Sequence, residues 1–353
     1  MSLWSLNLLA ALFLSMGCSN MPKYPKSDHY DGSRFFNPMN PEGNGLWSGL
    51  KMILTSRFEE WPDTLENTPD LELNHELSVD EIAVTFVNHA TVLVQSKSFN
   101  FLTDPVWSER VSPVTWAGPK RHRAPGIPFE ELPKIDFVVI SHNHYDHMDL
   151  STLQKLNKKF HPKFFVPLGN KNFLESQGIS DVVELDWWST FEMTSDLKIN
   201  LAPSDHFSGR SPFDKNKTLW GSYFISFGGH SVYFGGDTAY SPHFKAIHDH
   251  FGSPDIAFLP IGAYDPRWFM KVVHMNPDEA VRAHLDLNAF QSVGIHFGTF
   301  RLTGEKFDQP VKDLELALKS RNLISKEFVI LSEGRTQVFK LQSNGFKKFH
   351  NKK

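Results

Sequence analysis

The 353-residue sequence contains a single cysteine, Cys18. One thiol cannot form an intramolecular disulfide, which excludes a disulfide-stapled scaffold. The formal net charge is only −4, so the chain lacks the global basic field that holds nucleic acid, and nucleic acid is not an expected partner. There is also no internal repeat and no low-complexity block. With 40% hydrophobic and 22% charged residues, the chain can bury a large core as one α/β domain or as two smaller ones.

The apolar run at residues 3–18 is too short to span a membrane as a mature helix, and it predicts an export signal over residues 1–18. Its end, Leu14 to Cys18, resembles a bacterial lipobox, in which the cysteine is acylated and becomes the mature N-terminus. A plain cleaved signal and an unprocessed anchor are the alternatives. All three place the protein outside the cytoplasm. For a lipoprotein we expect the periplasmic side of a membrane, and the outer membrane where two exist, because Ser19 is not an acidic retention residue.

Residues 19–44 are rich in Pro, Asn, Asp and Lys and predict a tether or a surface wrap. Over residues 46–61, Leu, Ile, Phe and Trp recur at helical spacing until Pro62 ends the pattern, which predicts an amphipathic helix. Its apolar face either packs on the domain or faces lipid beside the anchored N-terminus. We assign this helix and everything after it to a single domain, residues 45–345.

Beyond residue 80, short apolar strands alternate with helices. Strands are expected at 82–87, 91–95, 99–102, 137–140, 163–166, 198–202, 219–227, 232–234 and 256–259, and helices at 150–160, 277–287 and 311–321. The second helix opens with Asn276 as N-cap, Pro277 in the first turn and Glu279 at the capping-box position. The pattern predicts stacked sheets with helices outside them.

The segment Ser141 to His147 reads SHNHYDH and directly follows the apolar run at 135–140. Three imidazoles and a carboxylate, buried together without a partner, would carry a large free-energy cost, whereas a divalent cation satisfies all of them. A solvated histidine-rich turn is the alternative, but the order H-x-H-x-D-H behind a buried strand is more specific than a compositional cluster. The loop therefore predicts one metal ion or two at a strand end.

Three further candidate ligands, His206, Asp237 and His296, each follow an apolar strand. A single histidine or a Gly-Gly-Asp turn is weak on its own, because each is commonly structural. Strand ends are, however, where an α/β framework collects a site from distant segments. Their joint occurrence therefore predicts that they complete the metal site.

This ligand order resembles the metallo-β-lactamase superfamily. The resemblance implies an α/β fold, the αββα sandwich of two packed mixed sheets flanked by helices, with two divalent metal ions. Zn²⁺ is the default, and Mn²⁺ or Fe²⁺ are compatible with the nitrogen and oxygen ligands. Antibiotic hydrolysis is not favoured, because the cysteine ligand of many β-lactamases is missing. Carried over to this sequence, the resemblance implies that the first metal is bound by His142, His144 and His206. It implies that the second metal is bound by Asp146, His147 and His296, and that Asp237 bridges the two.

Longer strings resemble one branch, the N-acyl-phosphatidylethanolamine-hydrolysing phospholipase D family. They are LTDPVW at 102–107, GPKR at 118–121, FGGDT at 234–238, PIGAYDPRWFM at 260–270, HMNP at 274–277 and HFGTF at 296–300. The match extends from about Asp31 onward. It implies hydrolysis, by a metal-bound hydroxide, of the phosphodiester between a diacylglycerol phosphate and an N-acylethanolamine, with a phospholipid as substrate and a membrane surface as partner.

Several residues are candidates for roles beside the metals. Asp146 would act both as ligand and as hydroxide orienter or proton acceptor. His274 is either an acid or phosphate contact or a structural partner of the helix that follows it. Arg267 and Lys271 either meet the phosphate or are solvated.

Two further side chains are candidates to orient the ligands. Asp104, at the end of a strand, is expected to orient a ligand histidine through a hydrogen bond, and His89 is a weaker candidate for the same role. Two other functions stay open. One is hydrolysis of a lactone or carboxylic ester, and the other is a non-catalytic metal-binding envelope lipoprotein. The oligomeric state is not predicted.

Overall fold

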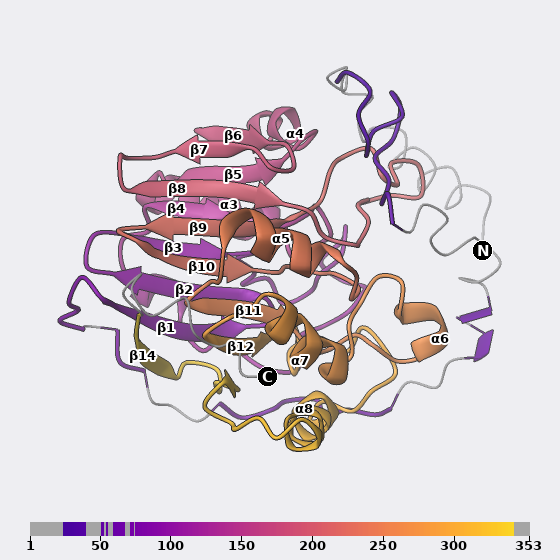
Figure 1. Cartoon of the computed structure of the whole chain (residues 1–353). Coiled ribbons are helices and arrows are strands. Elements are labelled where there is room, and N and C mark those ends of the chain that lie inside the picture. The colour runs from indigo at the N-terminus through magenta and orange to yellow at the C-terminus, as the bar shows by residue number, and fades with distance from the viewer. Residues whose placement is uncertain are drawn as a thin grey trace, which may run out of the picture.

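Two seven-stranded sheets pack face to face in the computed structural model (Figure 1), which describes residues 24–39, 51–52, 54–55, 59–67, 71–73 and 75–341. The first sheet is antiparallel from β14 to β3 and parallel from β3 to β6. Its strands, in spatial order, are β14 (Thr336–Lys340), β1 (Glu81–Asn88), β2 (Thr91–Ser96), β3 (Asn100–Thr103), β4 (Phe137–Val139), β5 (Lys163–Pro167) and β6 (Val182–Leu185).

The second sheet has the same mixed plan, parallel from β13 to β10 and antiparallel from β10 to β7. Its strands, in spatial order, are β13 (Phe328–Val329), β12 (Gln291–Ile295), β11 (Ile256–Pro260), β10 (His230–Phe234), β9 (Ser222–Phe227), β8 (Leu197–Ala202) and β7 (Thr190–Glu192).

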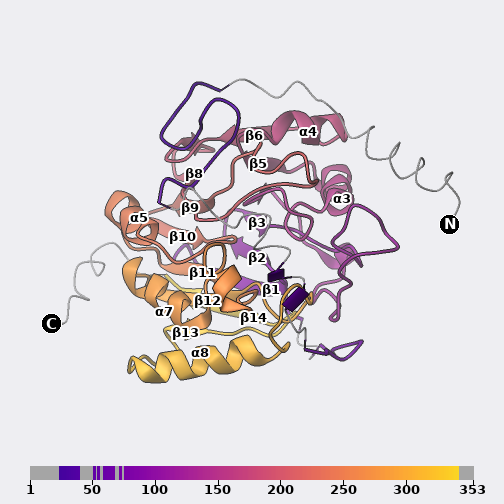
Figure 2. The same ribbon diagram turned by 90° about the vertical axis from the view of Figure 1, so that its right-hand side faces the viewer.

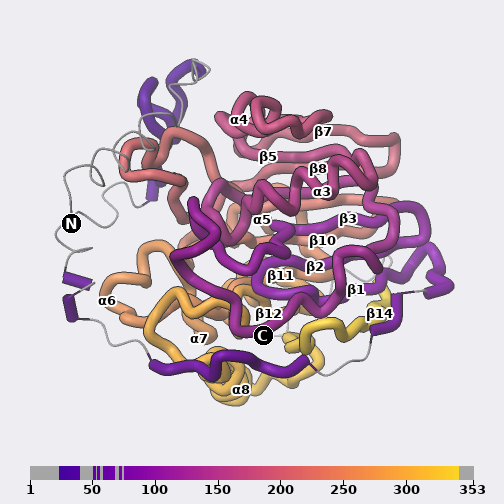
Figure 3. Tube along the Cα trace, turned by 180° about the vertical axis from the view of Figure 1, so that it is seen from behind, coloured from indigo at the N-terminus to yellow at the C-terminus, as the bar shows by residue number. Residues whose placement is uncertain are grey.

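Helices cover the outer face of each sheet, as the end-on view in Figure 2 shows. The first sheet is covered by α3 (Leu150–Phe160) and α4 (Lys171–Ser176), which lie nearest the viewer in Figure 3. The second is covered by α5 (His243–Phe251), α7 (Pro277–Asp286) and α8 (Gln309–Ser320). A short helix, α6 (Arg267–Met270), and a 3-10 turn, Phe129–Glu131, lie in loops. The αββα sandwich expected from the sequence is confirmed.

The side-chain alternation of β4 shows why this architecture forms. Phe137 and Val139 point into the core between the sheets, whereas Val138 points outward and packs in the layer that contains Leu153 of α3. Because both faces of the strand are covered, all three residues are buried, and the sequence shows a continuous apolar run instead of an apolar-polar alternation.

The expected elements agree with the structure except at some ends. The helix predicted at 150–160 has those bounds, and α7 has the expected capping box, in which the Asn276 side chain accepts from the Glu279 backbone N–H at 2.9 Å. The strand predicted at 219–227 begins only at Ser222. The preceding Gly221 instead donates its N–H to the Ser141 carbonyl of the metal loop.

Residues 24–39, here called the N-terminal strap, lie against the sandwich, with Tyr30 and Phe35 only 7% and 2% exposed. This part of the 19–44 segment is therefore a wrap on the domain. Within the helix expected at 46–61, residues 51, 52, 54 and 55 are helical, and Trp61 lies outside any helix. Residues 59 and 60 are not helical either, while residues 46–50, 53 and 56–58 and the 1–18 segment with Cys18 lie outside the described residues. Within the described ranges, no helix has the length and apolar character needed to cross a membrane.

Candidate metal centre

The predicted ligands converge at one edge of the sandwich, where several strands end. The loop from His142 to His147 follows β4, His206 follows β8, Asp237 follows β10, and His296 follows β12. Strand ends at a common edge bring together residues that are far apart in sequence. All seven predicted metal ligands therefore lie in one place.

The first cluster consists of His142, His144 and His206. Nε2 of His142 lies 2.7 Å from Nδ1 of His144, which in turn lies 3.3 Å from Nε2 of His206. The other ring nitrogens of two of these residues are already engaged: Nδ1 of His142 donates to the Ser141 hydroxyl at 2.9 Å, and Nδ1 of His206 donates to the Val273 carbonyl at 2.9 Å. The Nε2 lone pairs of His142 and His206 are therefore left facing the ring nitrogen of His144.

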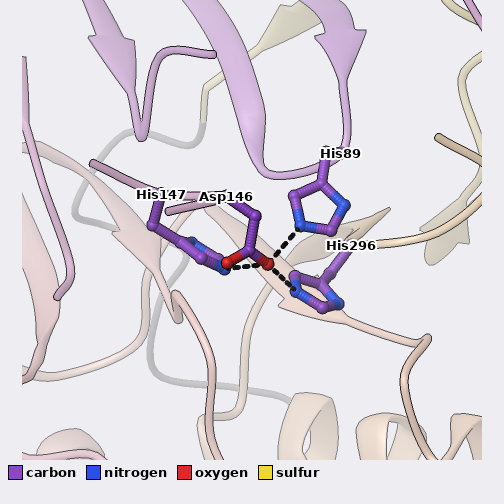
Figure 4. A group of neighbouring side chains, drawn as sticks. All are labelled: His89, Asp146, His147 and His296. Carbon is purple, nitrogen blue, oxygen red and sulfur yellow. Dashed lines mark hydrogen bonds and ion pairs between the residues drawn. The ribbon is translucent and has the colours of Figure 1, made fainter. Parts of the chain in front are cut away.

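The second cluster surrounds the carboxylate of Asp146 (Figure 4). Its Oδ2 lies 3.0 Å from Nε2 of His89, 3.3 Å from Nε2 of His147 and 3.6 Å from Nε2 of His296. The His89 and His296 rings lie with their centroids 4.0 Å apart. His89, the weaker candidate from sequence, is therefore in direct contact with two of the predicted ligands.

Asp237 lies between the two clusters. Its Oδ1 is 3.1 Å from Nε2 of His296, and its Oδ2 is 3.1 Å from Nε2 of His147 and 3.7 Å from Nε2 of His206. One carboxylate thus contacts ligands of both groups, which is the position that a bridging ligand requires.

The electrostatics of the two clusters differ. Burial lowers the pKa of His144 to about 3, that of His206 to about 4, and that of His142 well below its ordinary value. These three imidazoles are therefore neutral at pH 7, which is the state that binds metal.

In the second cluster, burial alone would lower the pKa of His296, but Asp237 and Asp146 raise it to about 9. Burial opposes charge on His147 too, yet the same carboxylates and Asp104 hold its pKa well above the ordinary value. Asp237 is held well below its ordinary pKa, because His147 and His296 outweigh its burial. In the metal-free protein, protons on these two histidines therefore offset the charges of Asp146 and Asp237.

The donor set fits divalent cations. Nε2 of His147, Nε2 of His296 and Oδ1 of Asp237 are buried, and within the described part of the chain their contacts with one another and with Asp146 are ion pairs that lack hydrogen-bond geometry. Such groups are costly unless a ligand satisfies them. Neutral imidazole nitrogens and carboxylate oxygens bind divalent metals, and the ligand atoms within each cluster lie within 4.8 Å of one another. The edge of the sandwich therefore carries a divalent metal site.

Comparison with known proteins decides the family. Residues 99–297 match the family described as "Beta-lactamase superfamily domain". The "N-acyl-phosphatidylethanolamine-hydrolyzing phospholipase D 1" of Caenorhabditis elegans is 39% identical over 328 residues, covering 84% of this chain and 90% of the worm protein. The chain belongs to this phospholipase D-like family of the metallo-β-lactamase superfamily.

Other relatives agree with this family assignment. The mitochondrial N-acyl-phosphatidylethanolamine-hydrolyzing phospholipase D of Saccharomyces cerevisiae is 39% identical over 221 residues, which cover 61% of this chain and 47% of the yeast protein. The structure of Igni18, a metallo hydrolase from Ignicoccus hospitalis, has the same fold, with a TM-score of 0.56 at 21% identity. The match covers 74% of this chain and all of Igni18. As a member of this family, the protein is a metal-dependent hydrolase.

The remaining predicted residues of this family member lie at different distances from the ligands. Nδ1 of His274 is buried and lies 3.9 Å from Oδ2 of Asp237, so this side chain faces the metal site. Arg267 does not face the ligands, because it donates to the His274 carbonyl at 2.8 Å and to the Glu279 carboxylate at 2.6 Å. Lys271 is exposed in the turn after α6.

Two supporting side chains were missed from the sequence. Arg210 donates to the carbonyls of Asn143 and Met148 in the metal loop, at 2.8 and 2.9 Å, and its guanidinium lies 3.9 Å from the Tyr145 ring centroid. Asn37, in the N-terminal strap, donates to the His206 carbonyl. Neither has a local sequence signal, because each acts through a backbone carbonyl of a distant segment.

Proposed function

We propose that this protein is a phosphodiesterase of phospholipase D type that hydrolyses N-acyl-phosphatidylethanolamine-like phospholipids. The worm and yeast relatives that carry this activity in their names support the choice of substrate. The structural observation that carries the proposal is the position of Asp237, which contacts ligand histidines of both clusters. Paired sites joined by a carboxylate suit a phosphodiester, which is an anion with an attacking and a leaving oxygen to stabilise.

Metal ions held by these residues would neutralise the phosphate charge and activate a water molecule as the nucleophile. Asp146 stays ionised, because three neighbouring histidines outweigh the effect of its burial and hold its pKa well below the ordinary value. As a carboxylate it can orient the attacking water and accept a proton from it. His274, whose Nδ1 lies 3.9 Å from Oδ2 of Asp237, would contact the phosphate or the leaving oxygen.

Hydrolysis of a lactone or carboxylic ester is the second candidate. It is favoured by Arg267, whose guanidinium is occupied by Glu279 and the His274 carbonyl and so is not presented to a phosphate. The position of His274 argues against it, because this candidate phosphate contact faces the metal site. The two candidates differ in the bond that is cleaved, which product analysis resolves.

Metal content and product release test the proposal together. We would measure the metals in the purified full-length chain by elemental analysis and follow phosphatidic acid release from N-acylated and plain phosphatidylethanolamine. We expect about two metals per chain, release of phosphatidic acid, and loss of activity in Asp237→Asn. Two metals with cleavage of a carboxylic ester and no phosphatidic acid would replace the proposal with the second candidate. No metal in an active enzyme would overturn both.

We also propose that the protein is an extracytoplasmic lipoprotein, anchored through Cys18 to the periplasmic side of a membrane, and of the outer membrane where two exist. The lone cysteine at the end of an apolar segment supports this location. Labelling by a clickable fatty acid should then be seen in the wild-type protein and abolished in Cys18→Ser, which should also keep the apolar segment at residues 1–18. A wild-type protein that takes up no label would overturn the proposal, and a label that persists in Cys18→Ser would show that another residue is acylated.

A further inference from the structure

We propose that Asn37 of the N-terminal strap is a positioning residue for the metal ligand His206. The first metal cluster would then reach its full affinity only when the strap is docked. This role does not depend on which substrate the enzyme hydrolyses, and it lies outside the segment 99–297 that matches the superfamily domain.

Asn37 joins the two ends of the loop between β8 and β9. Its Nδ2 donates to the His206 carbonyl at 2.8 Å, and its Oδ1 accepts from the Trp220 indole N–H at 3.1 Å. Asn37 itself is 8% exposed, His206 is 2% exposed, and Trp220 is 1% exposed. The Asn37 side-chain amide therefore satisfies the buried carbonyl of His206 and, at the other end of the loop, accepts from the buried indole N–H of Trp220.

His206 is consequently held at two points. The Val273 carbonyl accepts from Nδ1 of its ring and leaves Nε2 facing the first cluster, while Asn37 fixes its backbone. A ring hydrogen bond sets the tautomer and the rotation of an imidazole, but it does not fix the position of the chain that carries it. The contact with Asn37 supplies that second constraint.

The strap is anchored well enough to hold this position. The Tyr24 hydroxyl donates to the Glu184 carboxylate at 2.9 Å, and the His29 ring stacks on Trp187 with centroids 4.5 Å apart. The Phe35 side chain lies in the core between the sheets, and its backbone N–H donates to the Asn216 carbonyl at 2.8 Å. Asn37 therefore follows a docked segment that contacts both the sheets and the β8–β9 loop.

The chemistry of the contact requires an amide. Asparagine donates to one partner and accepts from the other at the same time. Aspartate keeps the volume and can still accept from Trp220, but its carboxylate cannot donate to the His206 carbonyl and would repel that oxygen. Alanine removes both contacts and leaves the buried carbonyl of His206 without this partner. A buried acceptor that loses its donor costs more free energy than the hydrogen bond itself contributes.

The test is metal binding by the full-length protein after its metals are stripped with a chelator. Asn37→Asp and Asn37→Ala would be titrated with Co²⁺, followed by its visible absorption, and with Zn²⁺ against a chromogenic chelator. We expect one binding phase, that of the first cluster, to weaken by about 10- to 100-fold, as is typical when a partner that orients a ligand is lost. The phase of the second cluster should be unchanged, and the Co²⁺ spectrum of the weakened phase should shift.

Asn170→Ala is the matched control. Asn170 is 1% exposed and donates to the Pro167 carbonyl at 2.8 Å, so the variant loses a buried hydrogen bond of the same kind with no contact to a metal ligand. It should lower the melting temperature but keep wild-type metal affinity. Wild-type affinity in both Asn37 variants would overturn the proposal, as would equal weakening in Asn170→Ala. Failure of both Asn37 variants to fold where Asn170→Ala folds would also overturn it, because Asn37 would then be needed for folding as such.

Discussion

Nδ1 of His147 lies 2.6 Å from Oδ2 of Asp104, and both side chains are completely buried. The same carboxylate accepts from the Ser141 hydroxyl at 2.5 Å and, through Oδ1, from the Ser141 backbone N–H at 2.7 Å. Since Ser141 also accepts from His142, Asp104 orients one ligand of each cluster. The sequence-based expectation that Asp104 holds a ligand histidine agrees with this geometry.

Asp104→Asn should weaken metal binding by about 10- to 100-fold with little change in fold, because the amide keeps the shape but not the charge that orients His147. Chelator competition measures the affinity, and circular dichroism checks the fold. Asp136→Asn is the control, since Asp136 is an acidic residue that accepts from Lys134 and Asn100 and has no contact with the ligands. Unchanged affinity in Asp104→Asn would show that His147 is oriented without this carboxylate.

Metal binding at pH 7 should release two protons, one each from His147 and His296, since both are protonated in the metal-free protein. Affinity should accordingly rise with pH, and the contribution of His296 to this rise should end above about 9, where His296 has lost its proton. Calorimetric titration in buffers of different ionisation enthalpy counts the protons. A count of zero at pH 7 would contradict the charge balance inferred for the second cluster.

The raised pKa of His296 also predicts how the stability of the metal-free protein depends on pH. A histidine whose pKa is raised by folding stabilises the protein fully below its unfolded value of 6.5, and that stabilisation is lost as the pH rises through about 9. The melting temperature of the chelated protein should therefore fall between pH 7 and pH 10. Asp237→Asn should flatten this dependence, because it removes the leading charge that raises both histidine pKa values.

Much of the framework could be predicted because its signals are local. The apolar run before His142 gives β4, and the Asn276-Pro277-Glu279 pattern gives the start of α7, since a strand period and a capping box are read within a few residues. The convergence of the predicted ligands could be expected for the same reason: each follows a strand, and strand ends meet at one edge.

What could not be predicted depends on contacts between distant segments. Asn37 reaches the His206 carbonyl across 169 positions, and nothing in its Pro- and Asn-rich surroundings marks it as buried. Arg267 was a candidate phosphate contact because of its charge, but only the fold reveals that Glu279, in the first turn of α7, occupies its guanidinium. A charged side chain in a loop has the same sequence signal whether it meets a ligand or a neighbouring helix.

Gly236→Ala should destabilise the protein and weaken metal binding. Gly236 has a φ of +56°, and a Cβ there would lie 2.5 Å from Cβ of Ser141, the first residue of the metal loop. The left-handed backbone and the overlap together should lower the free energy of unfolding by about 1–3 kcal/mol. Chemical denaturation of the chelated protein measures this loss. Gly178→Ala, also left-handed but with open space around the site, isolates the backbone contribution.

Arg210→Ala should lower kcat more than it raises KM, because Arg210 fixes the loop that carries His144, Asp146 and His147. Its guanidinium donates to the carbonyls of Asn143 and Met148, and losing these bonds leaves two acceptors of the loop without their partner, at a stability cost of about 2–4 kcal/mol. Arg210→Lys should recover only part of the loss, since an ammonium cannot stack on Tyr145 as a planar guanidinium does.

Steady-state kinetics on the metal-loaded protein, with melting temperatures in parallel, checks this prediction for Arg210. Arg34→Ala is the matched control, because Arg34 also donates to a backbone carbonyl, that of Lys215, but is exposed. It should leave kcat near the wild-type value. If Arg210→Lys has wild-type kcat and melting temperature, the loop needs only a positive charge at this position. If Arg210→Ala raises KM alone, Arg210 acts on substrate binding and the metal loop is held by its ligands and by Asp104.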